Sequence, residues 1–338
     1  MRDPGTPGAF ALILTLAAAG AACSGATVNG SVHTGGSIAS ANPSATVSTG
    51  IPNPFTVIAR YSAASLGLKN PRHLAIGADG NLYITDDSDR VTVVSPAGKV
   101  LRRWGHPGTG PGEFSFVSID NLDPSDVHAS IAVGRDGKVY VSDSGNHRIE
   151  VFSPTGTFIR QFGSFGLNDG QFLAPFDLAV DAQGNVYVAD DQQETLSKFS
   201  PGGHFEWSIG GVAATDPDLQ GGMHLANVDS HGRVVVAVSE AGRIVYIDAA
   251  GHKVDVFATA PQGGPCNVTV NGAGDTVVGS CPPDFDTRVF DRTHHLVGEW
   301  HQSPFETDAA PRFGPNSEVF AIGQGGSILE LKVALPGA

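Results

Sequence analysis

One phrase recurs three times along the chain, and this repetition constrains the fold more than any other feature. The copies run from Gly80 to Gly105, from Gly137 to Gly163 and from Gly184 to Gly210, and the second reads GKVYVSDSGNHRIEVFSPTGTFIRQFG. Apolar and polar residues alternate within each copy, as they do in half-buried β-strands. A turn written SPAG, SPTG or SPGG precedes the last strand, where Pro and Gly suit a tight reversal. The pattern predicts a repeated unit of short antiparallel strands.

Weaker copies raise the number of units to six, around Gly232, around Gly274 and at Arg312 to Gly323. Four strands in ~40–50 residues are typical of one blade of a β-propeller. A strand is left over at Phe55 to Ser62, and the sixth unit lacks its last strand. We therefore expect an all-β, six-bladed propeller over residues 51–338. Its N-terminal strand should pair into the last blade, which closes the ring and removes free sheet edges.

The first 50 residues have the composition of an export signal and a tether. Residues 1–22 contain an apolar run, Ala9 to Ala19, that is too short to span a bilayer as a helix. The following GAAC resembles a lipobox and predicts lipidation of Cys23, although cleavage after Ala21 would leave Cys23 as a thiol. Residues 23–50 are rich in Ser, Gly and Thr and predict a flexible tether. We expect an extracytoplasmic, membrane-anchored lipoprotein, with a secreted soluble protein as the alternative.

The other two cysteines, Cys266 and Cys281, lie symmetrically about the turn NGAGD. Facing residues of an antiparallel hairpin have Cα atoms about 4.5–5.5 Å apart, a separation that a disulfide accepts. Export would supply the oxidising compartment. The spacing predicts a disulfide bond, and two buried thiols are the alternative.

The second copy resembles the NHL repeat, with its aspartate, its Asn-His-Arg and its Gly-rich linker. Phe162 to Asp190 resembles a junction between two such repeats. The resemblance covers most of residues 51–338 and implies the propeller fold, but such propellers serve many functions. Related peptide-amidating lyases hold zinc with a histidine after proline at several strand starts. The residues at that position here are Arg72, Ala129, Phe176, His224 and Cys266. Only one of these five residues is a histidine, so the zinc site of the lyases is not matched. The calcium motifs of gluconolactonase-like propellers and a RING Cys/His array are also not found in the sequence. We therefore do not expect amidating-lyase, lactonase or ubiquitin-transfer activity.

The first strand of each blade should line the central channel, so the starts of these strands should meet at one mouth, the top face. The residues there are candidates for ligand binding: Arg72, His73, Ser130, Phe176, Asp177, His224 and Asn267. His73, Asp177 and Asn267 share one register in alternate blades and could converge on Ca²⁺ or Zn²⁺. The alternative is that they cap strand ends by bonding to neighbouring backbone groups. No other cofactor is expected.

Two further features concern loops. Asp143 with Arg148, and Asp86 with Arg90, flank the loop between paired strands and predict ion pairs that fix that loop. A longer insertion, VSIDNLDPSDVH, places Asp120, Asp123 and Asp126 before the second blade. A second long segment, Val212 to Gly222, lies two blades on. Together they could form an acidic rim for binding, or could be slack chain over the channel.

The formal net charge of −14 with only 20 basic residues argues against nucleic acid as a partner. Nucleophile-elbow, zinc-protease and phosphate-loop motifs are also missing from the sequence. We expect a monomeric, non-catalytic scaffold that binds a protein, a peptide or an envelope component at its top face and contacts the membrane through its lipid alone. A metal-dependent lyase or hydrolase at the channel mouth is one alternative. A small-molecule sensor with Arg72, Phe176 and His224 lining the channel is the other.

Overall fold

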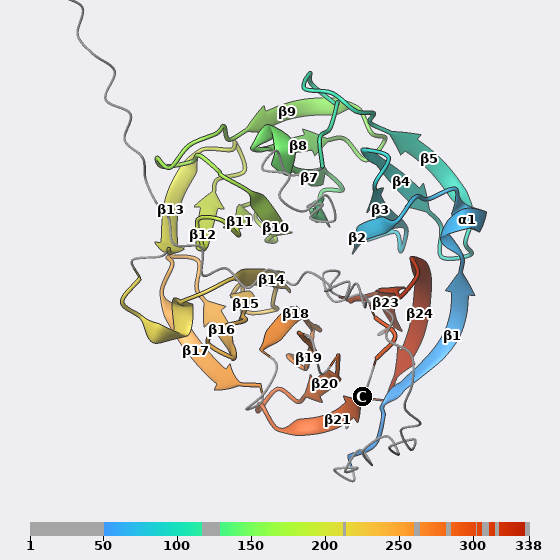
Figure 1. Ribbon diagram of the computed structural model, residues 1–338, viewed down its shortest axis with the longest axis vertical. Coiled ribbons are helices and arrows are strands. Elements are labelled where there is room, and N and C mark those ends of the chain that lie inside the picture. Colours follow the sequence, from blue (N-terminus) through green and yellow to red (C-terminus); the bar gives the residue numbers. More distant parts are fainter. Residues whose placement is uncertain are drawn as a thin grey trace, which may run out of the picture. The chain divides into compact units, whose positions relative to one another are not determined.

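Six four-stranded antiparallel sheets follow one another around a ring in the computed structural model (Figure 1). The structure describes residues 51–116, 129–211, 214–259, 264–281, 285–301, 303–305, 311–314 and 318–334. The chain divides into two units, 1–35 and 36–338, and every described residue belongs to the second. The prediction of an all-β, six-bladed propeller is confirmed.

The first five blades each use four consecutive strands, with the first strand toward the centre of the ring and the fourth at its circumference (Figure 1). The bounds are β2 (Pro71–Ile76), β3 (Leu82–Asp86), β4 (Arg90–Val94) and β5 (Val100–Trp104) in blade 1; β6 (Ile131–Val133), β7 (Val139–Asp143), β8 (Arg148–Phe152) and β9 (Phe158–Phe162) in blade 2; β10 (Pro175–Val180), β11 (Val186–Asp190), β12 (Thr195–Phe199) and β13 (Phe205–Gly210) in blade 3; β14 (Met223–Val228), β15 (Val234–Val238), β16 (Arg243–Ile247) and β17 (Lys253–Ala258) in blade 4; β18 (Pro265–Val270), β19 (Thr276–Ser280), β20 (Thr287–Phe290) and β21 (Leu296–Trp300) in blade 5.

Blade 6 joins the two ends of the propeller. It combines β22 (Arg312–Phe313), β23 (Glu318–Gly323) and β24 (Ser327–Val333) with β1 (Phe55–Tyr61). Phe55 lies opposite Val333 and Tyr61 lies opposite Ile328 in an antiparallel ladder. The predicted closure by the N-terminal strand is therefore confirmed.

A one-turn helix, α1 (Ala63–Leu66), follows β1. Its N-cap is Ser62, whose hydroxyl accepts a 3.1 Å hydrogen bond from the amide of Ser65. Among the described residues, no helix is long and apolar enough to cross a membrane.

The hydrophobic core is divided among the spaces between neighbouring blades. Between blades 1 and 2, for example, Tyr83 and Val93 pack with Phe114, Val141 and others that are similarly buried. Between blades 6 and 1, residues of β23 and β24 pack with residues of β2 and β3. Each sheet thus buries its faces only against its neighbours, which explains why the blade sequence recurs.

Two glycines that follow the outer strands show how closely the repeats match in space. Gly105 and Gly163 have φ angles of 88° and 92°. A Cβ atom at either position would lie 2.4 Å from the ring of Phe114 or of Phe172, respectively. Glycine is required at both because of the left-handed backbone and the ring packed against it.

The predicted disulfide between Cys266 and Cys281 is present, with the Cα atoms 4.9 Å apart. The ladder pairs Pro265 with Ser280 and Asn267 with Gly279, so Cys266 is the extra residue of an irregularity in β18. The amide of Cys281 donates a 2.8 Å hydrogen bond to the carbonyl of Gly264, beyond the end of the regular pairing.

Candidate functional site

The inner strands of three blades are irregular where they begin. The register shifts between Pro71 and Leu74 in β2, between Pro175 and Asp177 in β10, and between Pro265 and Asn267 in β18. A bulge of this kind changes the direction of a side chain and ends regular pairing. Five of the seven predicted ligand-binding residues lie at these irregularities: Arg72, His73, Phe176, Asp177 and Asn267.

Three of the candidates form a buried polar cluster from three blades. His73 Nδ1 lies 3.8 Å from Asp177 Oδ1, and the Ser130 hydroxyl donates a 2.8 Å hydrogen bond to the same oxygen. His73 and Asp177 are each 3% exposed and Ser130 is fully buried. The structure therefore brings His73 and Asp177 together, as the shared register predicts, and adds Ser130 to them.

Phe176 extends this cluster toward the fourth blade. Its ring meets His73 edge-on at a centroid distance of 6.0 Å and His224 at 5.2 Å. Phe176 is 6% exposed. The aromatic ring thus contacts both histidines and gives the cluster an apolar side.

Arg72 is held by an ion pair at the edge of blade 1. Its Nε lies 2.6 Å from Oδ1 of Asp87, and its Nη2 donates a 3.1 Å hydrogen bond to Oδ2. This bidentate contact uses the face of the guanidinium that could otherwise bind a carboxylate.

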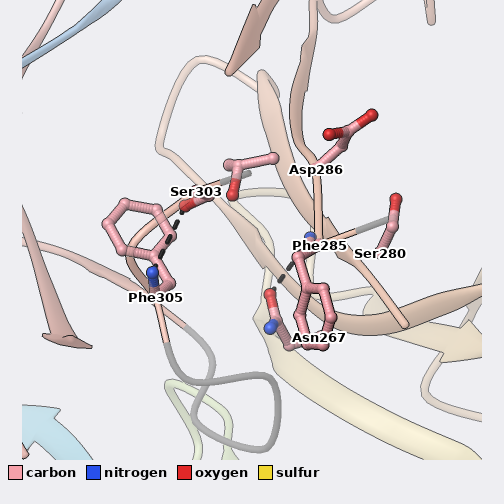
Figure 2. A pocket seen from close by; sticks show the side chains of 8 residues that line it. Asn267, Ser280, Phe285, Asp286, Ser303 and Phe305 are labelled. Atoms are coloured by element: carbon pink, nitrogen blue, oxygen red, sulfur yellow. Dashed lines mark hydrogen bonds between the residues drawn. The ribbon is translucent and has the colours of Figure 1, made fainter. Parts of the chain in front are cut away.

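Asn267 is engaged within its own blade. Its Oδ1 accepts a 3.1 Å hydrogen bond from the amide of Gly279 on the neighbouring strand. Figure 2 shows Asn267 among the residues of a small hollow, with Phe285 beside it. The hollow has a volume of only ≈ 10 Å³, at the lower limit for one water molecule. Of the three residues predicted to bind a metal, His73 and Asp177 lie side by side, whereas the side chain of Asn267 is hydrogen-bonded to the backbone of its own blade.

The loop predictions have different outcomes. Asp120, Asp123 and Asp126 of the insertion, and the predicted lipidation site Cys23, lie outside the described residues. In the second long segment, Asp216 and Asp218 each lie 2.7 Å from Nζ of Lys253 on β17. A lysine therefore offsets the charge of both carboxylates at this part of the expected acidic rim.

Both predicted Asp–Arg pairs are present. Arg148 Nε lies 2.7 Å from Asp143 Oδ2, and Arg90 Nη2 lies 3.2 Å from Asp86 Oδ2. Arg148 also donates to the backbone carbonyls of Thr109, Gly110 and Glu113, at 2.8–2.9 Å. It thus fixes the linker between blades 1 and 2.

Sequence reasoning missed a cluster of titratable residues on blade 5. Asp286, Glu299 and His301 bring their ligand atoms within 4.8 Å of one another, as a metal site would. Arg288 occupies this cluster, with Nη2 3.0 Å from Asp286 and Nε 2.8 Å from Glu299. The guanidinium offsets both carboxylates, so the arrangement is an ion network that ties β20 to β21.

Sequence reasoning also missed Arg312, because the sixth blade could not be aligned at its first strand. Arg312 lies opposite Phe320 in the sheet. In blades 1 to 3 the residues opposite the corresponding aromatic side chain are Ala75, Ala132 and Ala179. Alignment on the aromatic residue shared by the second strands of blades 1, 2, 3 and 6 would have revealed this arginine among alanines.

An exposed apolar pair marks the linker between blades 2 and 3. Phe165 is 66% exposed and Leu167 is 75% exposed. Phe165 pairs with Phe172 in an isolated β-bridge, and in the linker between blades 1 and 2 Pro107 pairs with Phe114 in the same way. By this register Pro107 and Thr109 occupy the places of Phe165 and Leu167, so the linker conformation does not require large apolar residues.

Comparisons with known proteins agree with this architecture. The family model described as "NHL repeat" matches residues 129–152, which include β6, β7 and β8. Protein brain tumor of Drosophila melanogaster is 31% identical over 94 residues, which are 28% of this chain and 9% of that protein. Peptidyl-glycine alpha-amidating monooxygenase of Mus musculus is 36% identical over 120 residues, 32% of this chain and 11% of the relative. NHL repeat-containing protein 3 of Homo sapiens is 32% identical over 91 residues, 26% and 23% of the two chains. The chain therefore spans less than a quarter of each of these relatives.

Solved structures share the fold over a greater length. A streptogramin B lyase structure has a TM-score of 0.54 and 13% identity, and the match covers 83% of this chain and 98% of the lyase. A catalytically inactive virginiamycin B lyase from Staphylococcus aureus, with quinupristin, has a TM-score of 0.55 and 13% identity, and the match covers 83% of this chain and all of the lyase. At these identities the likeness concerns the fold alone. The protein is thus a six-bladed β-propeller that contains an NHL repeat at residues 129–152.

Proposed function

We propose that this protein is an exported, lipid-anchored, non-catalytic scaffold whose top face binds a protein, a peptide or another envelope component. The observation that carries the proposal is the pair Phe165 and Leu167, 66% and 75% exposed on one linker. This linker leads from β9 to the start of β10, which is the side of the ring defined here as the top. Binding residues are commonly found on loops held by a rigid scaffold, and exposed aromatic residues are frequent anchors of interfaces.

Phe165 and Leu167 also differ from the residues at the same positions of the preceding linker. The equivalent linker one blade earlier has Pro107 and Thr109 in these positions and the same bridge to a buried phenylalanine. His147 packs against Phe165 at a centroid distance of 4.8 Å, which limits the freedom of the ring. A partly fixed, exposed ring loses little entropy when a partner covers it.

The test is affinity capture from the envelope of the producing cells, with the partner quantified by mass spectrometry. The amount of partner captured by the double variant Phe165→Ser/Leu167→Ser should be at least about tenfold lower than that captured by the wild-type chain, as expected for removing two hot-spot side chains. The control is Val254→Ser, which removes an equally apolar side chain, 50% exposed, from β17. Equal capture by the double variant and the control would refute the proposal.

Export and anchoring rest on two features. The Cys266–Cys281 disulfide is typical of an oxidising compartment, and the GAAC sequence ending at Cys23 favours a lipid. Cells fed a clickable fatty acid should label the wild-type chain and not the Cys23→Ala variant. Label on both chains, or on neither, would contradict the anchor.

The second candidate function is a metal-dependent lyase or hydrolase at the channel mouth. The cluster of His73, Asp177 and Ser130 favours it, because a carboxylate and an imidazole 3.8 Å apart are ligands that Zn²⁺ accepts. Metal content measured after incubation with Ca²⁺, Zn²⁺ or Mg²⁺ and desalting tests it. One ion per chain, lost in both His73→Ala and Asp177→Ala, would support the enzyme, and no retained ion in the wild-type chain would favour the scaffold.

A further inference from the structure

Residues of the inner strands of the six blades line a cavity in the central channel. Its volume is ≈ 240 Å³, many times the roughly 10–15 Å³ that one water molecule needs. Its wall is divided. Blades 1 to 3 contribute only apolar side chains, among them Ala75, Ala132 and Ala179, whereas blades 4 to 6 contribute Asn227, Thr269 and Arg312 together with Val228 and Phe313. The cavity therefore has an apolar half and a second half, here called the polar half, that carries all of its polar side chains.

Within the polar half, the side chain of Asn227 is already used. Its carboxamide donates to the carbonyl of Val270 and accepts from the amide of the same residue, both at 3.1 Å. Thr269 is 1% exposed and offers the cavity little polar surface. Arg312 is left as the charged group that faces the cavity.

The guanidinium of Arg312 has few hydrogen-bond partners for a charged group on the wall of a cavity. Among the described residues, its one hydrogen bond is from Nη1 to the carbonyl of Pro311, at 3.3 Å, although a guanidinium carries five N–H donors. Burial lowers the pKa of Arg312 and the charge of Asp177 opposes this lowering, but arginine stays charged at neutral pH. Arg312 is partly buried on the cavity wall, where a cation is stabilised by an anion or by several acceptors.

We propose that the channel binds a small monocarboxylate with a short apolar tail. The carboxylate lies on the guanidinium of Arg312, and the tail lies against Ala75, Ala132 and Ala179. A carboxylate matches the planar guanidinium with two parallel hydrogen bonds. A single negative charge fits better than a multiply charged anion, because Asp177 already contributes negative potential to Arg312. This inference is independent of the top-face scaffold, since the cavity residues are not those of the exposed linker.

The test is isothermal titration of the full chain with sodium hexanoate, sodium acetate and neutral hexanamide. Wild-type protein should bind hexanoate saturably at one site, acetate more weakly, and hexanamide not at all. Arg312→Gln should weaken hexanoate binding at least tenfold, while Arg292→Gln, which removes an exposed arginine, should leave the affinity unchanged. Circular dichroism and the urea midpoint of each variant establish that it is folded.

Ala132→Leu tests the apolar half without touching the charge. Ala132 is partly accessible and lines the cavity, so leucine there should exclude the tail. Its predicted effect is weaker binding of hexanoate with acetate unchanged. The proposal is overturned if the wild-type chain binds no carboxylate saturably, if hexanamide binds as well as hexanoate, or if folded Arg312→Gln keeps the wild-type affinity.

Discussion

Arg148 Nη2 lies 3.1 Å from Oε1 of Glu150, two residues along the same strand, while its Nε bonds to Asp143. One buried guanidinium therefore serves two carboxylates that are both fully buried. We predict that Arg148→Met lowers the free energy of unfolding by ~3–5 kcal/mol, because it leaves two buried acids without their cation. Urea unfolding measures the change.

The control for this variant is Lys138→Met. Lys138 pairs with Asp136, and their side chains are 39% and 52% exposed, so the change in unfolding free energy should stay below ~1 kcal/mol. Similar losses of unfolding free energy in the two variants would contradict the prediction, because they would mean that burial does not increase the contribution of the Arg148 network to stability.

The same network predicts a pH dependence. Burial raises the pKa of Glu150 to about 7 and that of Asp143 to about 6, although hydrogen bonds and Arg148 oppose the rise. Both groups therefore bind protons more tightly in the folded state than in the unfolded state. Their contribution to stability is complete below the unfolded pKa values, near 4, and is lost as the pH rises through 6 to 7.

Urea unfolding at pH 5, 6, 7 and 8 measures this dependence, with Glu150→Gln as the comparison. Wild-type stability should fall relative to that of Glu150→Gln between pH 5 and pH 8, because glutamine does not titrate. Parallel curves for the two proteins over this range would contradict the predicted pKa.

Much of the fold could be predicted because its determinants are local. The alternation of residues and the SPxG turns specify each hairpin, and the leftover strand Phe55 to Ser62 could pair only with the incomplete last blade. The Cys266–Cys281 bond and the Asp143–Arg148 pair followed from positions flanking a single turn or loop.

The parts that were missed depend on contacts between blades or on departures from the repeat. Arg312 lies on a strand of two residues, too short for its period to be recognised. The exposure of Phe165 was not predicted, because the same loop position in other blades carries different residues. Asp286, Glu299 and His301 are brought together by strand pairing in a blade whose sequence no longer matches the repeat.

Loss of the disulfide should destabilise the propeller by about 3 kcal/mol, the chain-entropy value for a closed loop of this length. The variant Cys266→Ser/Cys281→Ser shows the effect without a reductant. Dithiothreitol should lower the urea midpoint of the wild-type chain to that of the variant. A midpoint in the wild-type chain that does not respond to reduction would contradict a stabilising role.

Closure of the ring should depend on Phe55. This residue is 6% exposed and packs against Trp300 and Phe305 with centroid distances of 5.7 and 5.9 Å. Phe55→Ala should cost about 3–5 kcal/mol of unfolding free energy. Ile58→Ala, on the same strand but 54% exposed, should change it by less than ~0.5 kcal/mol. Equal effects would show that β1 contributes no buried contacts to closure.

Binding at the top face is tested most directly by photo-crosslinking from the linker that carries Phe165 and Leu167, in the cells that make the protein. A benzophenone amino acid is placed at Leu167 and, as the control, at Ile159, which is 43% exposed on the outer strand β9 of the adjacent blade. We expect one discrete adduct of higher mass from position 167 and none from position 159. No adduct from position 167, or the same adducts from both positions, would contradict binding at the top face.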